Sequence, residues 1–127
     1  MKKSVLVVVL AALAAVLAGC APHYVNLTPR QLPRTPENVH LFEVQWDTPR
    51  TGADNAEVKA YVVMGTEFHP MRRVPNTAGR WEARVPLPAD RASVPYYYKF
   101  DYTYPGSPHR VSASDRSPEY RLTVPRQ

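Results

Sequence analysis

Proline is the residue that most limits the folds open to this chain. Fourteen prolines occur among its 127 residues, more than twice the usual share of about 5%. Because proline lacks a backbone N–H and clashes with the preceding helical turn, it interrupts helices and is kept out of central strands. All of them lie after residue 20. The distribution therefore disfavours long helical bundles and favours short elements joined by turns.

Between the prolines, apolar and polar residues alternate with the period of two that is typical of a β-strand with one buried face. The alternation predicts about seven short strands, at residues 39–46, 57–64, 68–74, 80–87, 96–104, 109–113 and 119–124. Pro70 confines the third of these to a sheet edge or a bulge. Residues 114–118 are predicted to form a loop.

This pattern predicts an all-β fold with a single domain. Clean alternation of apolar and charged positions is typical of antiparallel sheets, and closely spaced turns are typical of an immunoglobulin-like β-sandwich. The predicted sandwich covers residues 39–127. That length is sufficient for such a core without a disulfide.

The first twenty residues have the pattern of an export signal. Lys2 and Lys3 form a basic start, and the thirteen residues from Val5 to Leu17 are apolar. Such a run is short for a membrane-spanning helix but is typical of a signal peptide. It ends in Leu17-Ala18-Gly19-Cys20, which resembles the lipobox of bacterial lipoproteins. The alternative is a plain secretory signal or an uncleaved N-terminal helix, in either of which Cys20 is incidental.

The lipoprotein resemblance implies cleavage after residue 19, a thioether-linked diacylglycerol on Cys20 and an amide-linked acyl chain such as palmitate. Residue 21 is alanine rather than the aspartate that retains such proteins in the inner membrane, so the resemblance implies an outer-membrane location facing the periplasm. Cleavage would leave 14 basic residues against 11 acidic ones, a charge of +3. Nucleic acid is therefore not an expected partner.

Residues 20–38 join this signal to the predicted sandwich. They contain Pro22, Pro29, Pro33 and Pro36 and have no helical periodicity, which favours an extended tether that holds the domain away from the bilayer. The alternative is that part of this segment packs along the sandwich as an irregular edge, through Tyr24, Val25 and Leu27.

Residues 57–101 resemble the glycogen-binding modules attached to starch-active enzymes and kinase subunits. The resemblance rests on Gly65 and Phe68, on Trp81, and on Tyr98-Lys99-Phe100. The tryptophan that those modules place shortly after the phenylalanine is absent, and His69 and Met71 stand there instead. The resemblance implies the sandwich fold and, as a second expectation, sugar binding.

Three residues are the candidate ligand contacts: Trp81, Tyr97 and Lys99. Tyrosine and tryptophan offer flat apolar faces that stack on sugars or anchor a protein interface. Tyr97 points opposite to the apolar face of its strand, beside Lys99 and Asp101, and so could form a polar recognition patch. A solvated sheet face accounts for these residues equally well.

Other chemistry-bearing residues do not form a recognised motif. The histidines at positions 23, 40, 69 and 109 stand alone, so no metal site is predicted. His109, Ser112, Ser114 and Asp115 contain the residue types of a hydrolase triad, but without a Gly-x-Ser-x-Gly elbow. We expect no cofactor and no enzymatic activity. The arginines alternate with carboxylates, as on an ordinary charged surface.

Two functions follow as expectations. The first is a lipid-anchored envelope lipoprotein that acts as a non-catalytic binding or assembly module for a protein partner. The second is a glycan-binding lipoprotein that uses Trp81, Lys99 and the tyrosines.

Overall fold

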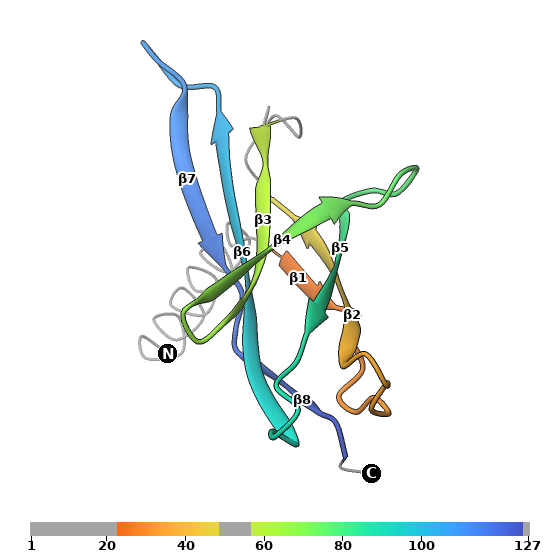
Figure 1. Cartoon of the computed structure of the whole chain (residues 1–127). Helices are drawn as coiled ribbons and strands as arrows, with labels where there is room; N and C mark the ends of the chain where they lie inside the picture. Colours follow the sequence, from red (N-terminus) through yellow and green to blue (C-terminus); the bar gives the residue numbers. More distant parts are fainter. Residues whose placement is uncertain (1–22, 49–56, 126–127) are drawn as a thin grey trace, which may run out of the picture.

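The computed structural model describes residues 23–48 and 57–125. Eight strands lie in these ranges, labelled in Figure 1: β1 His23–Asn26, β2 Val39–Asp47, β3 Lys59–Met64, β4 Glu67–Arg73, β5 Arg80–Pro86, β6 Ser93–Tyr104, β7 Val111–Arg116 and β8 Tyr120–Thr123. The described residues form no α-helix, and none of their segments is a helix that could cross a membrane. The predicted signal segment and Cys20 lie outside the described residues.

The strands form one antiparallel sheet in the order β1-β2-β5-β4-β3-β6-β7, and β8 also pairs with β6. Strand β4 links two layers, because its residues 67–71 pair with β3 whereas Arg72 and Arg73 pair with β5. The all-β antiparallel class is therefore confirmed. The layers are joined as one curled half-barrel, instead of standing as two separate sheets (Figure 1). Pro70 lies in the part of β4 that pairs with β3 alone.

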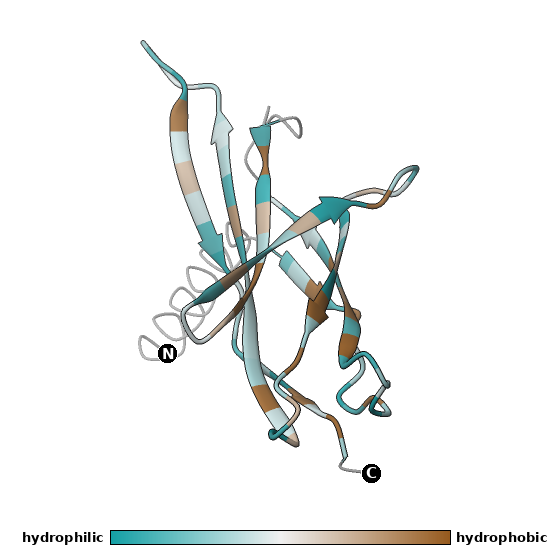
Figure 2. Cartoon of the chain, viewed as in Figure 1, coloured by the Kyte–Doolittle hydropathy of each residue, from teal (hydrophilic) through white to brown (hydrophobic). Residues whose placement is uncertain are grey.

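Alternation along the strands places the core between the two layers. Along β6, Val94, Tyr96, Tyr98, Phe100 and Tyr102 are all at most 3% exposed, as the period of two predicts. Figure 2 shows residues of contrasting hydropathy following one another along β3 and β7. The core is rich in aromatic rings, which bury a large apolar area per residue.

The segment before β2 is part of the fold. Strand β1 pairs with β2 from His23↔Asp47 to Asn26↔Val44, and Gln31 forms a parallel bridge with Thr123 of β8. Of the two alternatives for this segment, packing along the sheet holds for residues 23–38, and the domain begins at His23 instead of Val39. The free tether is therefore a wrong prediction for these residues.

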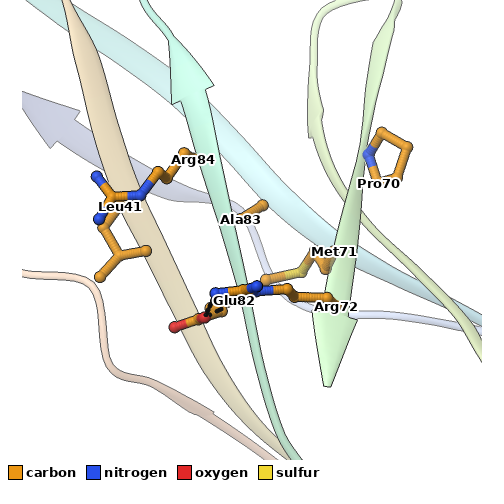
Figure 3. Close-up of a pocket in the computed structure, with 7 residues that line it drawn as sticks. All are labelled: Leu41, Pro70, Met71, Arg72, Glu82, Ala83 and Arg84. Atoms are coloured by element: carbon orange, nitrogen blue, oxygen red, sulfur yellow. Dashed lines mark hydrogen bonds and ion pairs between the residues drawn. The ribbon is translucent and has the colours of Figure 1, made fainter. Parts of the chain in front are cut away.

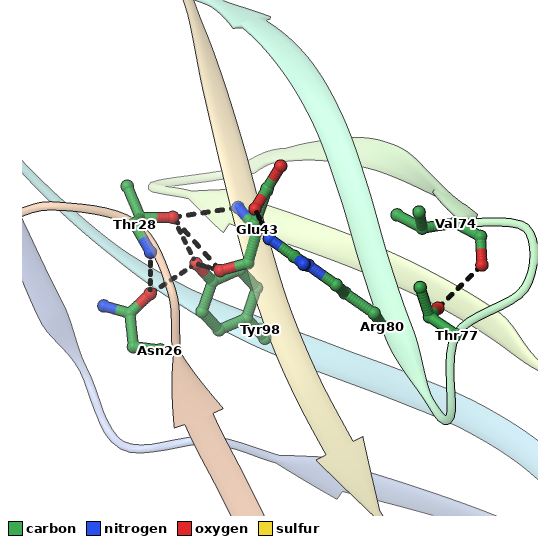
Figure 4. Close-up of polar contacts among 7 residues, drawn as sticks. All are labelled: Asn26, Thr28, Glu43, Val74, Thr77, Arg80 and Tyr98. Atoms are coloured by element: carbon green, nitrogen blue, oxygen red, sulfur yellow. Dashed lines mark hydrogen bonds and ion pairs between the residues drawn. The ribbon is translucent and has the colours of Figure 1, made fainter.

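Buried polar groups hold this N-terminal segment to β6 (Figure 4). The Tyr98 hydroxyl donates to Asn26 Oδ1 at 2.7 Å and lies 2.8 Å from Thr28 Oγ1. The Asn26 amide donates to the Tyr96 hydroxyl at 2.8 Å, and the Glu43 backbone N–H donates to Thr28 Oγ1 at 2.9 Å. Each polar group thus has a partner where water is excluded, which is the condition for burying it at low cost.

Strand β7 also differs from its prediction. It runs to Arg116, so residues 114–116 form a strand instead of a loop. The twelve-residue β6 offers partners that the local sequence does not reveal: Asp101 pairs with Ser114, and Lys99 pairs with Arg116. Asp115 points inward, where its carboxylate accepts a hydrogen bond from the Tyr102 hydroxyl at 2.8 Å.

The buried tyrosines predict that stability falls in alkali. Burial raises the pKa of Tyr24, Tyr96 and Tyr98 above the ordinary value of 10.0. The folded state therefore keeps these protons after the unfolded chain has lost them. The stabilisation is complete below about pH 10 and declines above it, by up to about 1.4 kcal/mol per pH unit for each phenol.

The urea midpoint should fall between pH 9 and pH 11, and an unchanged midpoint would contradict this burial. The urea midpoint of Tyr98→Phe should fall less between pH 9 and pH 11 than that of the wild type, whatever the stability of the variant at neutral pH.

Candidate functional site

The structure separates the three predicted ligand contacts. Trp81 lies on the inner face of β5 and is only 5% exposed, with its ring centroid 5.8 Å from that of Phe100. Because alternate residues of a strand face opposite sides, a residue that packs in this core cannot also reach a ligand on the outer face. The structure therefore places Trp81 in the core, apart from Tyr97 and Lys99.

Tyr97 and Lys99 do lie together on the outer face of β6. Both are half-buried, and neighbouring strands place further side chains beside them. Tyr61 of β3 lies opposite Lys99, and Arg116 of β7 lies opposite Lys99 on the other side. We call Tyr61, Phe68, Tyr97, Lys99 and Arg116 the outer patch.

Rings and cations alternate within the outer patch. The rings of Tyr61 and Phe68 meet edge to face, with centroids 5.9 Å apart. Lys99 Nζ lies 5.8 Å from the Phe68 ring centroid, and Arg116 Cζ lies 3.8 Å above that of Tyr97. Such cation–ring contacts contribute about 0.5–1 kcal/mol each at exposed sites. These contacts already restrict the long side chains of Lys99 and Arg116, so these side chains lose less conformational entropy when a partner binds.

A buried valine supports the outer patch. Val63 lies directly opposite both Phe68 and Tyr97, and it is only 1% exposed although it faces away from the main core. Directly opposed side chains of an antiparallel sheet are in contact, so the two rings cover Val63. Phe68 itself is 53% exposed, the most of any large apolar residue that the structure describes. In the outer patch, the ring of Phe68 is thus accessible and rests on a packed support that includes Val63.

One carboxylate borders the outer patch. Asp101 lies 3.0 Å from Lys99 Nζ and accepts a hydrogen bond from Ser114 Oγ at 2.7 Å. Partial burial would raise the pKa of the Asp101 carboxyl, but Ser114 and Lys99 outweigh that effect and the pKa is lowered. Asp101 is therefore ionised and paired at neutral pH. The outer patch offers fixed charges and a ring, which suits binding rather than proton transfer.

A cavity of about 490 Å³ opens where β4 and β5 diverge (Figure 3). Across its mouth Arg72 Nη2 lies 2.8 Å from Glu82 Oε1. The other lining residues are Leu41, Pro70, Met71, Ala83 and Arg84. Its one carboxylate, Glu82, is held in this ion pair, and the lining contains no histidine, cysteine, serine or threonine.

An apolar groove of about 370 Å³ lies between the N-terminal segment and β2. Leu27 and Leu41 line it and are 38% and 36% exposed. His40 is buried in its wall, with Nε2 3.1 Å from the Pro33 carbonyl oxygen. This histidine holds the proline-rich segment against β2.

The residue types of a hydrolase triad are not assembled. Ser112 and Ser114 face outward on β7, whereas Asp115 faces inward to Tyr102, and His109 lies in the exposed β6–β7 turn. Among the residues that the structure describes, no three histidine or carboxylate side chains converge as metal ligands.

Sequence reasoning singled out Tyr97 and Lys99 but not the other members of the outer patch. A signal for Tyr61 and Phe68 is the two-residue turn at Gly65-Thr66, where Gly65 has a φ of +58°. A two-residue hairpin turn fixes the register of the strands that it joins, and this register places Phe68 opposite Val63.

Comparison of the chain with family models, with curated proteins and with solved structures finds no match.

Proposed function

We propose that the protein is a lipid-anchored envelope lipoprotein that acts as a non-catalytic binding module for a protein partner. The anchor is supported by the lipobox pattern that ends at Cys20. The outer membrane, facing the periplasm, is the location that Ala21 supports by the same resemblance. The observation that carries the binding role is the outer patch, with Phe68 exposed above fixed cations and rings.

The chemistry of the outer patch favours a protein over a glycan. Sugars stack on open aromatic faces, and the outer patch offers Phe68 alone as an accessible ring, because the Arg116 guanidinium covers one face of Tyr97 at 3.8 Å and Trp81 lies in the core. Aromatic residues and arginine together are enriched in the binding hot spots of protein interfaces. Lys99 and Arg116 would favour a partner that surrounds an apolar contact with carboxylates.

We expect the double variant Phe68→Ala/Arg116→Ser to weaken partner binding at least about tenfold, because loss of each hot-spot contact costs more than about 1 kcal/mol. Crosslinking in envelopes, with a photoreactive phenylalanine analogue at position 68 of the otherwise wild-type chain, should first capture the partner as a discrete protein adduct. Titration of that partner with the wild-type and the double-variant domain then measures the loss of affinity.

The matched control places the same analogue at Leu27, which lines the apolar groove and is not among the residues that line the β4–β5 cavity. A specific adduct at position 27 with none at 68 would move the interface to the groove and refute the outer patch. Retention of the wild-type domain on a glucan or peptidoglycan column, without any protein adduct, would favour the glycan-binding alternative.

A further inference from the structure

The folded domain begins very close to the proposed acylation site. Only Ala21 and Pro22 separate Cys20 from His23, and His23 is already paired with Asp47 of β2. Three Cα steps span at most about 10 Å, because an extended chain advances about 3.3–3.6 Å per residue. If Cys20 carries lipid, as the proposed function requires, the domain lies against the bilayer instead of being held away from it.

Strand register shows which end of the domain is nearest to Cys20. The Tyr24 and Phe100 rings are 5.9 Å apart, and Phe100 pairs with Asp115 of β7. Tyr24 and Asp115 are therefore at a similar height, and the successive antiparallel pairings make β1 and β7 run in the same direction.

Counting back along both strands places Val111 four residues before Asp115, or about 13 Å at the rise of a strand. Cys20 stands the same number of residues before Tyr24, so its reach extends to about the height of Val111. The β6–β7 hairpin projects from this end of the molecule (Figure 1). Cys20 and the β6–β7 hairpin can thus approach one bilayer surface together.

The hairpin has a composition suited to lipid headgroups. Tyr104 pairs with Val111, which is 40% exposed, and residues 105–110 are all exposed. Residues 104–112 contain no carboxylate, and they include two prolines and Arg110. Tyrosine is enriched at membrane interfaces. Arg110 Nε lies 3.5 Å from Glu57 Oε2, and both side chains are about half exposed, so the guanidinium can also extend toward headgroups while its stem stays in apolar surroundings.

We propose that the β6–β7 hairpin rests in the headgroup layer of the membrane that holds the acyl chains of Cys20. This seating gives the domain a fixed orientation. Tyr97 lies seven residues before Tyr104 along β6, which is about 24 Å from the hairpin end. The outer patch would then face the aqueous space, open to a partner.

The test uses the acylated full chain in vesicles of phosphatidylethanolamine and phosphatidylglycerol that contain a headgroup-level quencher lipid. Because Cys20 is the chain's one cysteine, acylation leaves no native thiol, and a fluorophore can be attached at Ser107→Cys in the hairpin. The matched control is Thr66→Cys, in the exposed β3–β4 turn at the opposite end. Loss of most of the fluorescence at position 107, with little change at 66, is expected.

If the quencher lipid removed the same fraction of the fluorescence at positions 107 and 66 in acylated, vesicle-bound protein, the hairpin would not lie in the headgroup layer. The proposed anchor would remain intact. The mass of the purified chain reports acylation separately, and a chain without acyl groups would overturn both proposals. Val111→Asp should reduce the quenching at position 107 while the protein stays bound to the vesicles, because a carboxylate on the hairpin is disfavoured among anionic headgroups.

Discussion

Replacing Phe100 with alanine is expected to lower the free energy of unfolding by about 3–5 kcal/mol. Phe100 is fully buried, stacks on Trp46 at a centroid distance of 4.4 Å, and meets Trp81 edge to face at 5.8 Å. The two tryptophans belong to β2 and β5, so Phe100 joins the two layers of the curled sheet. Removing its ring would leave a cavity between rigid strands that cannot collapse to fill it.

Urea denaturation at pH 7 measures this effect. A domain of this size has a total stability of about 5–15 kcal/mol, so the variant should be strongly destabilised or unfolded. Phe100→Leu keeps most of the apolar volume and should lose less. Phe68→Ala is the matched control, because Phe68 is 53% exposed and lies outside the core. Similar losses for Phe68→Ala and Phe100→Ala would show that Phe100 does not link the layers.

The strands with a continuous buried face could be predicted from the sequence. In β2 and β6 the inward positions are apolar or aromatic except His40, and the observed bounds differ from the predicted ones by a few residues. The reason is that alternation records which side of a strand meets the core, and hydrophobic burial is the dominant favourable term in folding. The curl of the sheet was not predictable in this way. It depends on β4 changing partners, which no local pattern records.

Strand β1 was hidden because its stabilising contacts are distant in sequence. Only four residues long, it has no fully buried side chain. Its position is fixed by pairing with β2 and by Asn26 and Thr28, which contact Tyr98 about seventy residues away. From the sequence alone, polar residues such as Asn26 and Thr28 that lie between prolines resemble those of a linker. Their role is evident only once the buried Tyr98 hydroxyl that they hydrogen-bond is known.

The candidate site was predictable only in part, because its members also come from strands that are distant in sequence. Alternation places Tyr97 and Lys99 on an outer face, but it cannot tell which strands lie beside them. Trp81 is a different case, because it belongs to the apolar side of the alternating residues 80–87, whereas the family resemblance suggested a ligand contact. In the structure the requirement to fill the core decides, because Trp81 packs on Phe100.

Replacing Cys20 with serine is expected to abolish acylation and to shift the mature domain from the membrane to the soluble fraction. Each buried methylene of an acyl chain contributes about 0.8 kcal/mol of membrane affinity, and one chain alone gives only marginal, reversible binding, so stable attachment depends on having several. Serine has no thiol that can form the thioether. The measurement is envelope fractionation together with the mass of the purified chain.

The matched variant is Ala21→Asp, which leaves Cys20 in place. By resemblance to sorted lipoproteins, it should remain acylated and move to the inner membrane. Suppose instead that the mass of the Cys20→Ser chain differs from that of the wild type only by the exchange of sulfur for oxygen, and that its location is unchanged. Cys20 would then be incidental, and its short distance from His23 would say nothing about a bilayer. The outer patch would then have to function without an acyl anchor to orient it.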